Sequence, residues 1–262
     1  MTTDITAAAQ AIAADIAAGN EFRPLSEAAA GDMAWAYAVQ RAVAMELIHS
    51  KARTRVAGFK VAVNSAALMQ HFGVSEPAAA HVFADEVHDS PARLGLSSYG
   101  SFQYEPEIAA VFDAALPARE TPYSEAEVAG AIGRFVPAFE LIDTRGARIP
   151  DLTLVDAVTQ NITNAGAVLG GPGVPAGELD ADTLATTVRE NGETILEATG
   201  ARPQPPLEAA TFVVNKFGSM GIGMDAGMFI LCGTHQPPRL LTAPTRIEVD
   251  MGPLGTVEMG LT

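Results

Sequence analysis

The sequence predicts an α+β fold with a mixed, largely antiparallel, curled sheet and a small N-terminal helical part. Three observations favour this class. The chain has 262 residues, 48% of them hydrophobic and 18% charged, which is typical of a globular chain long enough to bury a core. The predicted helices are scattered along it, and most predicted strands are hairpin-like. Regular alternation of strands and helices would instead indicate a parallel α/β sheet.

The first part of the chain is predicted to be helical. Apolar residues at helical spacing indicate helices over 3–18 and 32–50, and Asp32 can cap the second. The polar and small residues of 21–31 separate them. We therefore divide the chain into a helical part over 1–54 and a sheet domain over 55–262.

The sheet domain opens with VAGFKVAV, whose alternation places Phe59, Val61 and Val63 on one face and Lys60 on the other. The Asn191-Gly192 pair predicts a hairpin over 184–199. The remaining predicted strands are 102–112, 137–145, 228–232, 246–251 and 254–260. The remaining predicted helices are 65–72, 124–134, 153–163 and 206–217, the first two opened by capping residues.

The charge balance bears on the partners of the chain. Lys and Arg total 16 against 31 Asp and Glu, which gives a formal charge of -15. Since no basic stripe appears, a nucleic-acid partner is excluded. The negative field would repel small anions, so an enzyme acting on them needs a local cation, such as a metal or a buried Lys.

Cysteine usage and hydropathy indicate the compartment. Cys232 is the only cysteine, which excludes an intrachain disulfide and a cysteine-based zinc site. The N-terminus lacks the basic and apolar regions of a secretory signal, and no apolar run reaches the length of a membrane span. We expect a soluble cytoplasmic protein without a membrane partner.

Three glutamates stand in apolar strand sequences. Glu105 and Glu107 lie two apart and therefore share a strand face, where like charges raise each other's pKa unless a cation neutralises them. Glu140 lies in PAFELIDTR, where a lone carboxylate needs a partner. An oxygen-only shell suits Mg²⁺ or Mn²⁺ better than Zn²⁺.

A second interpretation of these glutamates stays open on spacing alone. Glu105 and Glu107 would face solvent on an edge strand beside Pro106. Glu140 would pair with Arg145 or Arg148.

Five sequence segments resemble a known family. YEPEIAAVF, PAFELIDTR and VDAVTQN, with GFKVAVNS before them and DAGMFILCG after, resemble the 2-keto-4-pentenoate hydratase branch of the fumarylacetoacetate hydrolase superfamily. The likeness runs from about residue 30 to the end of the chain. It implies a β-roll core, homo-oligomers, and Mg²⁺ or Mn²⁺ on Glu105, Glu107 and Glu140.

The resemblance also implies roles for four further residues. Lys60 aligns with the lysine of the family's G-x-K-I-G-L-T-S motif and would place a positive charge near the substrate carboxylate or donate a proton. Ser65, Asn161 and Thr163 align with its substrate-binding positions. Without the resemblance, Lys60 would be interpreted as a surface lysine and the others as capping residues.

The chain departs from the family pattern around Lys60 and in the loop aligned with residues 77–80. Ala62 and Asn64 replace a glycine and a threonine, and Ala78 replaces the aspartate of the hydratase active site. Related 4-oxalocrotonate decarboxylases can carry an apolar residue there. His81 follows and could replace that aspartate as general base, because its reference pKa lies near neutrality; the alternative is a partly buried loop histidine.

Two further residues have simpler expectations. His235 follows the predicted strand 228–232 and is either a substrate contact or a loop histidine. Cys232 is expected to be a buried strand residue.

The resemblance implies a lyase that adds water to a small 2-hydroxy-dienoate or 2-oxo-enoate, such as 2-keto-4-pentenoate, in the catabolism of aromatic or related compounds. A bound cation would polarise the 2-oxo group and stabilise an enolate, which hydration, decarboxylation and tautomerisation share. The alternatives are decarboxylation of a 2-oxo-3-enedioate, hydrolysis of an acylpyruvate, and a non-catalytic homologue that serves as a binding or assembly subunit.

Overall fold

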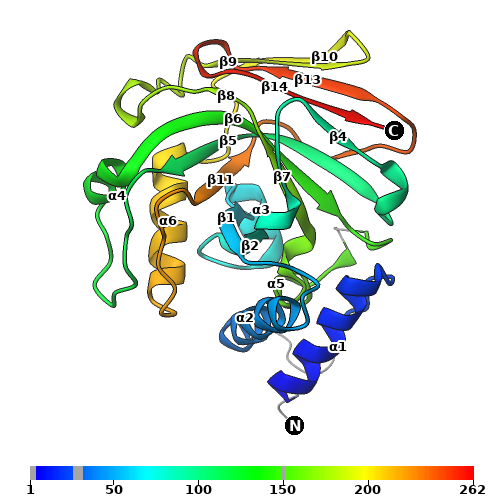
Figure 1. The fold of residues 1–262 in the computed structure, drawn as a ribbon. Coiled ribbons are helices and arrows are strands. Elements are labelled where there is room, and N and C mark those ends of the chain that lie inside the picture. The colour runs from blue at the N-terminus through cyan, green and yellow to red at the C-terminus, as the bar shows by residue number, and fades with distance from the viewer. Residues whose placement is uncertain (1–3, 26–31, 149–150) are drawn as a thin grey trace.

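The computed structural model describes residues 4–25, 32–148 and 151–262, and within them the α+β class is confirmed (Figure 1). Residue 3 of the first predicted helix and most of the predicted break over 21–31 lie outside the described residues. The helices are α1 (Ile5–Ala18), α2 (Met33–His49), α3 (Ala66–Phe72), α4 (Glu125–Ala131), α5 (Leu154–Thr159) and α6 (Pro206–Gly218).

The described strands form two mixed sheets, one of eight strands and one of six. The larger contains β1 (Val56–Ala62), β2 (Ala78–Phe83), β3 (Val87–Asp89), β5 (Phe102–Phe112), β6 (Ile132–Asp143), β7 (Asn164–Leu169), β11 (Phe229–Thr234) and β12 (Arg239–Leu240). The smaller contains β4 (Ala92–Leu94), β8 (Gly171–Pro172), β9 (Ala185–Glu190), β10 (Glu193–Thr199), β13 (Arg246–Asp250) and β14 (Gly255–Leu261).

The larger sheet has the strand order β2-β1-β11-β5-β6-β7-β3, with β12 added along β5. The β1–β11 and β3–β7 pairs are parallel and its other pairs are antiparallel. Figure 1 shows β5 and β6 as long curved strands, with the smaller sheet on one side of them and α1 and α2 on the other. The curvature gives the sheet a concave side.

Two hydrophobic clusters hold the layers together. The larger cluster joins both sheets and α6, and includes Phe59, Phe135 and Phe217. The second packs α1 and α2 against β2 and α5, and includes Trp35 and Leu154. The division of the chain at residue 54 stays a prediction, because the helices and the sheet share this second cluster.

The outer edge of β2 is covered by side chains. The Ala79 N–H donates to the Tyr37 hydroxyl at 3.0 Å, and the Ala79 carbonyl accepts from Gln40 Nε2 at 3.1 Å. The same Gln40 nitrogen donates to the Val158 carbonyl at 3.0 Å, which ties α2 to α5. These bonds satisfy backbone groups that an edge strand would otherwise leave open for pairing with another chain.

Several predicted elements are confirmed and others need correction. Strand 102–112 and the hairpin over 184–199 are observed as predicted. The helix predicted over 124–134 ends at Ala131, because β6 begins at Ile132 and runs longer than the predicted strand 137–145. The segment aligned with a loop, residues 77–80, is instead part of β2 from Ala78 onward, so His81 is a buried strand residue.

Among the described helices, none combines the length and the apolar character needed to cross a membrane.

The link between α2 and the sheet edge can be tested at Gln40, a residue that is 1% exposed. Gln40→Met keeps the length of the side chain but leaves two buried carbonyls without their donor, so we expect the free energy of unfolding to fall by roughly 2–3 kcal/mol. Urea denaturation measures the change, and Gln70→Met, on the exposed surface of α3, is the control. Equal stability of the two variants would contradict this account of the edge.

Candidate active site

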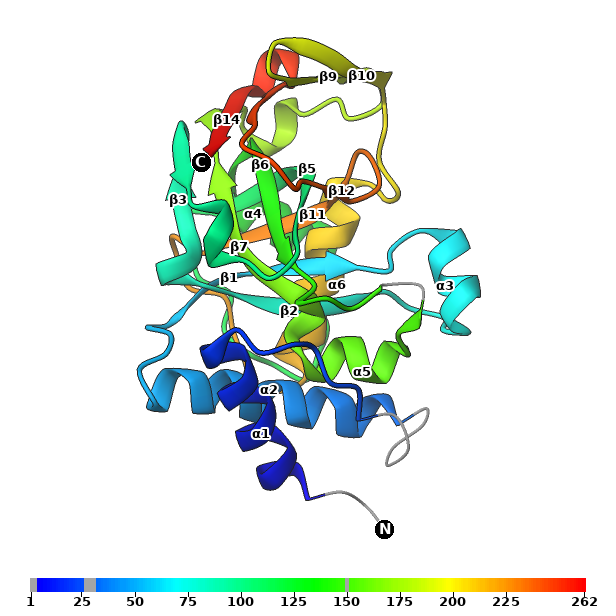
Figure 2. The same cartoon turned by 90° about the vertical axis from the view of Figure 1, so that its right-hand side faces the viewer.

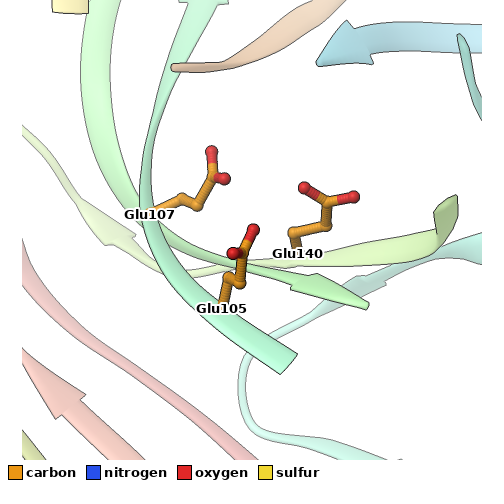
Figure 3. A group of neighbouring side chains, drawn as sticks. All are labelled: Glu105, Glu107 and Glu140. Carbon is orange, nitrogen blue, oxygen red and sulfur yellow. The ribbon is translucent and has the colours of Figure 1, made fainter. Parts of the chain in front are cut away.

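The three predicted glutamates converge on the same side of the larger sheet (Figure 3). Glu105 and Glu107 project from one face of β5, and Glu140 is the direct cross-strand partner of Glu105 on β6. One carboxylate oxygen from each lies within 4.8 Å of the other two. This grouping follows from the two-residue period of a strand and from the β5–β6 register.

Each of the two fully buried carboxylates is held through one oxygen only. Glu107 Oε2 accepts from the Gly233 N–H at 2.8 Å. Glu140 Oε1 accepts from Lys60 Nζ at 2.5 Å and from Asn164 Nδ2 at 3.1 Å. Their other oxygens, Glu107 Oε1 and Glu140 Oε2, are buried and have no hydrogen-bond partner among the described residues.

The electrostatics of the group favour a bound cation. Burial, with the charge of Glu140 beside it, raises the pKa of Glu105 to about 8, although Lys60 acts in the opposite direction. Burial and the neighbouring carboxylates also raise the pKa of Glu107 well above its usual range. One lysine cannot balance the negative charge of three carboxylates, and two of the carboxylates have an oxygen without a hydrogen-bond partner. The site therefore fits an oxygen-loving divalent ion such as Mg²⁺ or Mn²⁺.

The Gly233 N–H reaches Glu107 because β11 is irregular there. The β11–β5 register shifts between Leu231 and Thr234, and Gly233 adopts a φ of +111°. A Cβ on Gly233 would lie 2.6 Å from Asn64 Nδ2, so a larger residue would be both strained and too close. The bulge thus turns a backbone donor toward a metal-ligand candidate.

Lys60 and Glu105 line one cavity of about 620 Å³. The Lys60 side chain is 4% exposed and pairs with Glu140. It lies on the face opposite Phe59, as its strand parity predicted. The alternative pairing of Glu140 with an arginine is not observed. Arg145 donates instead to Gln160 and to the Asn20 carbonyl, and Arg148 lies 3.5 Å from Asp151.

The structure places the three predicted substrate-binding residues differently. Thr163 lines the cavity. Asn161 accepts from the His81 N–H and donates to the His81 carbonyl, both at 2.9 Å, so its side chain continues the cover of the β2 edge. Ser65 caps α3 by accepting from the Leu68 N–H at 3.2 Å and does not line the cavity.

The backbone beside the cavity is unusual. Asn161, Ile162 and Thr163 all have positive φ, at 56°, 49° and 55°, and Val63 has a φ of 54°. Non-glycine residues rarely adopt this conformation, β-branched ones least of all, and such strain gathers at functional sites. The helix predicted over 153–163 therefore ends at Thr159, and the residues after it turn Thr163 to the cavity wall.

The structure does not bring His81 to the carboxylates. His81 pairs with Phe59 in the β1–β2 register, so its ring shares the face opposite Lys60. The ring centroid lies 5.6 Å from that of Phe59 and 4.9 Å from that of Phe217. Burial lowers the pKa of His81 to about 4.

His235 and Cys232 also lie outside the cavity. His235 Nδ1 is 2.8 Å from the Thr186 hydroxyl, and burial lowers the pKa of this histidine to about 4. Cys232 is a buried strand residue, as predicted.

Sequence reasoning missed Gly233 and Asn164, the residues that anchor Glu107 and Glu140. A glycine inside the apolar strand FILCGT is a signal of a bulge and could have identified the first. Asn164 carries no comparable signal in a single sequence.

The burial of His81 makes a prediction about acid stability. Its pKa in the folded protein is about 4, below the ordinary 6.5, so the unfolded chain binds a proton that the folded one rejects. The contribution of His81 to folding stability is therefore complete above about pH 6.5 and is lost as the pH drops toward 4, by roughly 3 kcal/mol. We expect His81→Leu to reduce the loss between pH 7 and pH 5 in urea denaturation, whereas His49→Leu, at an exposed position, retains it. An identical loss in both variants would refute the assignment.

Comparison with known proteins agrees with this geometry. No family model matches the chain. The chain is 28% identical over 248 residues to a 2-keto-4-pentenoate hydratase of Burkholderia vietnamiensis, covering 94% of this chain and 93% of the relative. It is 29% identical over 236 residues to a protein of the same name from Paraburkholderia phymatum, covering 89% and 88%. A solved 4-oxalocrotonate decarboxylase from Pseudomonas putida G7, complexed with magnesium and adipate, shares the fold with a TM-score of 0.87 and 22% identity, over 98% of this chain and 97% of that one.

Proposed function

The chain belongs to the fumarylacetoacetate hydrolase superfamily, in the branch of 2-keto-4-pentenoate hydratases and 4-oxalocrotonate decarboxylases, and we propose that it is a divalent-metal-dependent lyase of small 2-oxo acids. The observation that carries the proposal is the grouping of Glu105, Glu107 and Glu140, the last two with unpartnered buried oxygens, next to a cavity that Lys60 and Glu105 line.

Glu105, Glu107 and Glu140 would hold Mg²⁺ or Mn²⁺. Such an ion supplies a Lewis acid that polarises the carbonyl of a 2-oxo acid. The Gly233 N–H and Lys60 each fix one carboxylate oxygen and leave the other free, which orients the ligands before any ion binds.

Lys60 would attract the carboxylate of the substrate and donate a proton from Nζ. The Glu140 carboxylate holds that ammonium group at the cavity wall. The Thr163 hydroxyl would hydrogen-bond the substrate from the same wall. Substrate contacts by Ser65 and Asn161 stay predictions. Each side chain already makes hydrogen bonds, Ser65 in the cap of α3 and Asn161 at the edge of β2, and would have to share them with the substrate. Assembly into homo-oligomers also stays a prediction.

We place hydration first, with a 2-hydroxy-dienoate or 2-oxo-enoate as substrate. In that reaction water adds across a carbon–carbon double bond, and a polar group must orient it. His81 could act as that base only if its ring reached the cavity, and the ring lies on the opposite face of β1 and β2. Gln103, which lines the cavity, is better placed to bind a water molecule.

Decarboxylation of a 2-oxo-3-enedioate is the second candidate. It is supported by Ala78, which shares the face of Lys60 and puts a methyl group where the hydratase pattern has a carboxylate. An assay that follows both CO₂ release and the hydrated product separates the two reactions. Rapid CO₂ loss without a hydrated product would reverse our order.

The metal ligands make the first prediction of this proposal. Changing Glu105, Glu107 or Glu140 to Gln removes a negative ligand, so we expect the dissociation constant for Mn²⁺ to rise at least about tenfold and metal-dependent turnover to be lost. Isothermal titration with Mn²⁺ measures the first effect. Glu248→Gln, in a surface pair with Arg189, serves as the control. Unchanged Mn²⁺ affinity in all three variants would exclude this site.

The second prediction of this proposal concerns Lys60. Lys60→Met should lower kcat by at least ~10²-fold, because proton donation and the charge next to the substrate are both lost. The Mn²⁺ affinity is measured in the same variant, so that loss of metal is distinguished from loss of chemistry. Lys216→Met is the matched control, since Lys216 pairs with Glu76 outside the cavity. A kcat equal to that of the unsubstituted enzyme would show that Lys60 has only a structural role.

A further inference from the structure

The cavity beside Lys60 is larger than a five-carbon substrate needs. Its volume is about 620 Å³. Even at the roughly 30 Å³ that a liquid water molecule occupies, the eight non-hydrogen atoms of a five-carbon 2-oxo-enoate would fill well under half of it. Space therefore remains beyond the atoms that Lys60 and the carboxylates would engage.

Most of this additional space is lined by apolar side chains. They come from α3, α5 and β12 and from the segments that follow β1 and α5, and include Val63, Leu68, Phe72, Leu154, Ile162 and Leu240. Figure 2 shows α3 projecting from the sheet on the side where β1 ends. An apolar wall that continues from a polar catalytic end is suited to a substrate with one charged end and one apolar end.

Two of these wall residues are exposed to an extent that is uncommon for leucine in this protein. Leu68 is 45% exposed and Leu240 is 56% exposed, and among the described residues the other large apolar side chains with such exposure are Ile5 and Met45. A ligand tail that covered Leu68 and Leu240 would remove apolar surface from water, which stabilises binding.

The cavity offers little to a second carboxylate. Its lining contains two cationic side chains, Lys60 and Arg148. In the proposed function Lys60, which is also paired with Glu140, binds the first carboxylate of the substrate, so it is not available to a second. The Arg148 side chain is 78% exposed and lies 3.5 Å from Asp151. A carboxylate placed against the apolar wall would lose its hydration without gaining a buried partner.

We infer that the substrate is a 2-hydroxy-dienoate or 2-oxo-enoate whose far end carries an apolar alkyl or aryl substituent, and not a second carboxylate. This inference rests on the proposed function and makes its substrate class specific. It also favours hydration over decarboxylation, because the decarboxylation considered above releases a second carboxylate.

The test compares kcat/KM, in the presence of Mg²⁺, for 2-hydroxy-dienoates that differ only at the far end: hydrogen, propyl, phenyl or carboxylate. Each buried methylene should raise kcat/KM by up to about fourfold, so we expect the propyl compound to exceed the unsubstituted one by at least ~10-fold and the carboxylate compound to be the poorest.

Two variants locate the effect. Leu68→Ser and Leu240→Ser should each reduce the ratio of kcat/KM for the propyl compound to that for the unsubstituted one by at least about threefold, because they remove apolar contact from the tail. Met45 is an exposed apolar residue on α2 that does not line the cavity, so Met45→Ser should leave this ratio unchanged.

The outcomes separate this inference from the function beneath it. Turnover of the carboxylate compound above that of the propyl compound, lost in Arg148→Gln, would overturn the inference and leave the metal-dependent chemistry intact. Equal kcat/KM for all four compounds would also overturn the inference and leave the metal-dependent chemistry intact. Absence of turnover with every compound, in enzyme shown to bind Mn²⁺, would overturn the proposed function and the inference together.

Discussion

The cross-strand pairing of Glu105 with Glu140 is the constraint on which the rest of the site depends. Two carboxylates placed opposite each other on adjacent strands, with Glu107 on the same face, repel each other and lose hydration as they become buried. Three groups compensate for this repulsion and lost hydration: Lys60 from β1, the Gly233 N–H from β11 and the amide of Asn164 from β7. These groups satisfy one oxygen of each buried carboxylate, and the remaining need is for a cation.

The strands that supply these groups are positioned by features distant from the chemistry. β1 lies between β2 and β11, and the outer edge of β2 is covered by Tyr37, Gln40 and Asn161. The N-terminal helices thus take part in holding the strand that carries Lys60. The bulge at Gly233 has the corresponding role for Glu107, because a regular strand would not direct its N–H to that carboxylate.

The sequence predicted those parts of the site that follow from strand parity. Glu105 and Glu107 had to share a face, and Lys60 had to oppose Phe59, once the strands were recognised. The strand β2 was missed because Ala78, Ala79 and Ala80 have little preference for a strand, and their extended state depends on β1 and on side chains from α2. The position of His81 was missed for the same reason. The prediction of helix over 161–163 was wrong, because tertiary contacts of Asn161, and not local preference, hold a left-handed turn there.

The order in which these groups come together along the chain has a consequence for folding. β5 and β6 are consecutive in the sequence, so their pairing closes a comparatively short loop. Two of the groups that hold the buried carboxylates are distant in the sequence: Gly233 is 126 residues from Glu107, and Lys60 lies on β1, the first strand along the chain. Contacts of such long range form slowly. If the β5–β6 pair forms first, its carboxylates must stay protonated or hydrated until β1 and β11 pack beside it. The complete site is therefore present only when the sheet has finished folding.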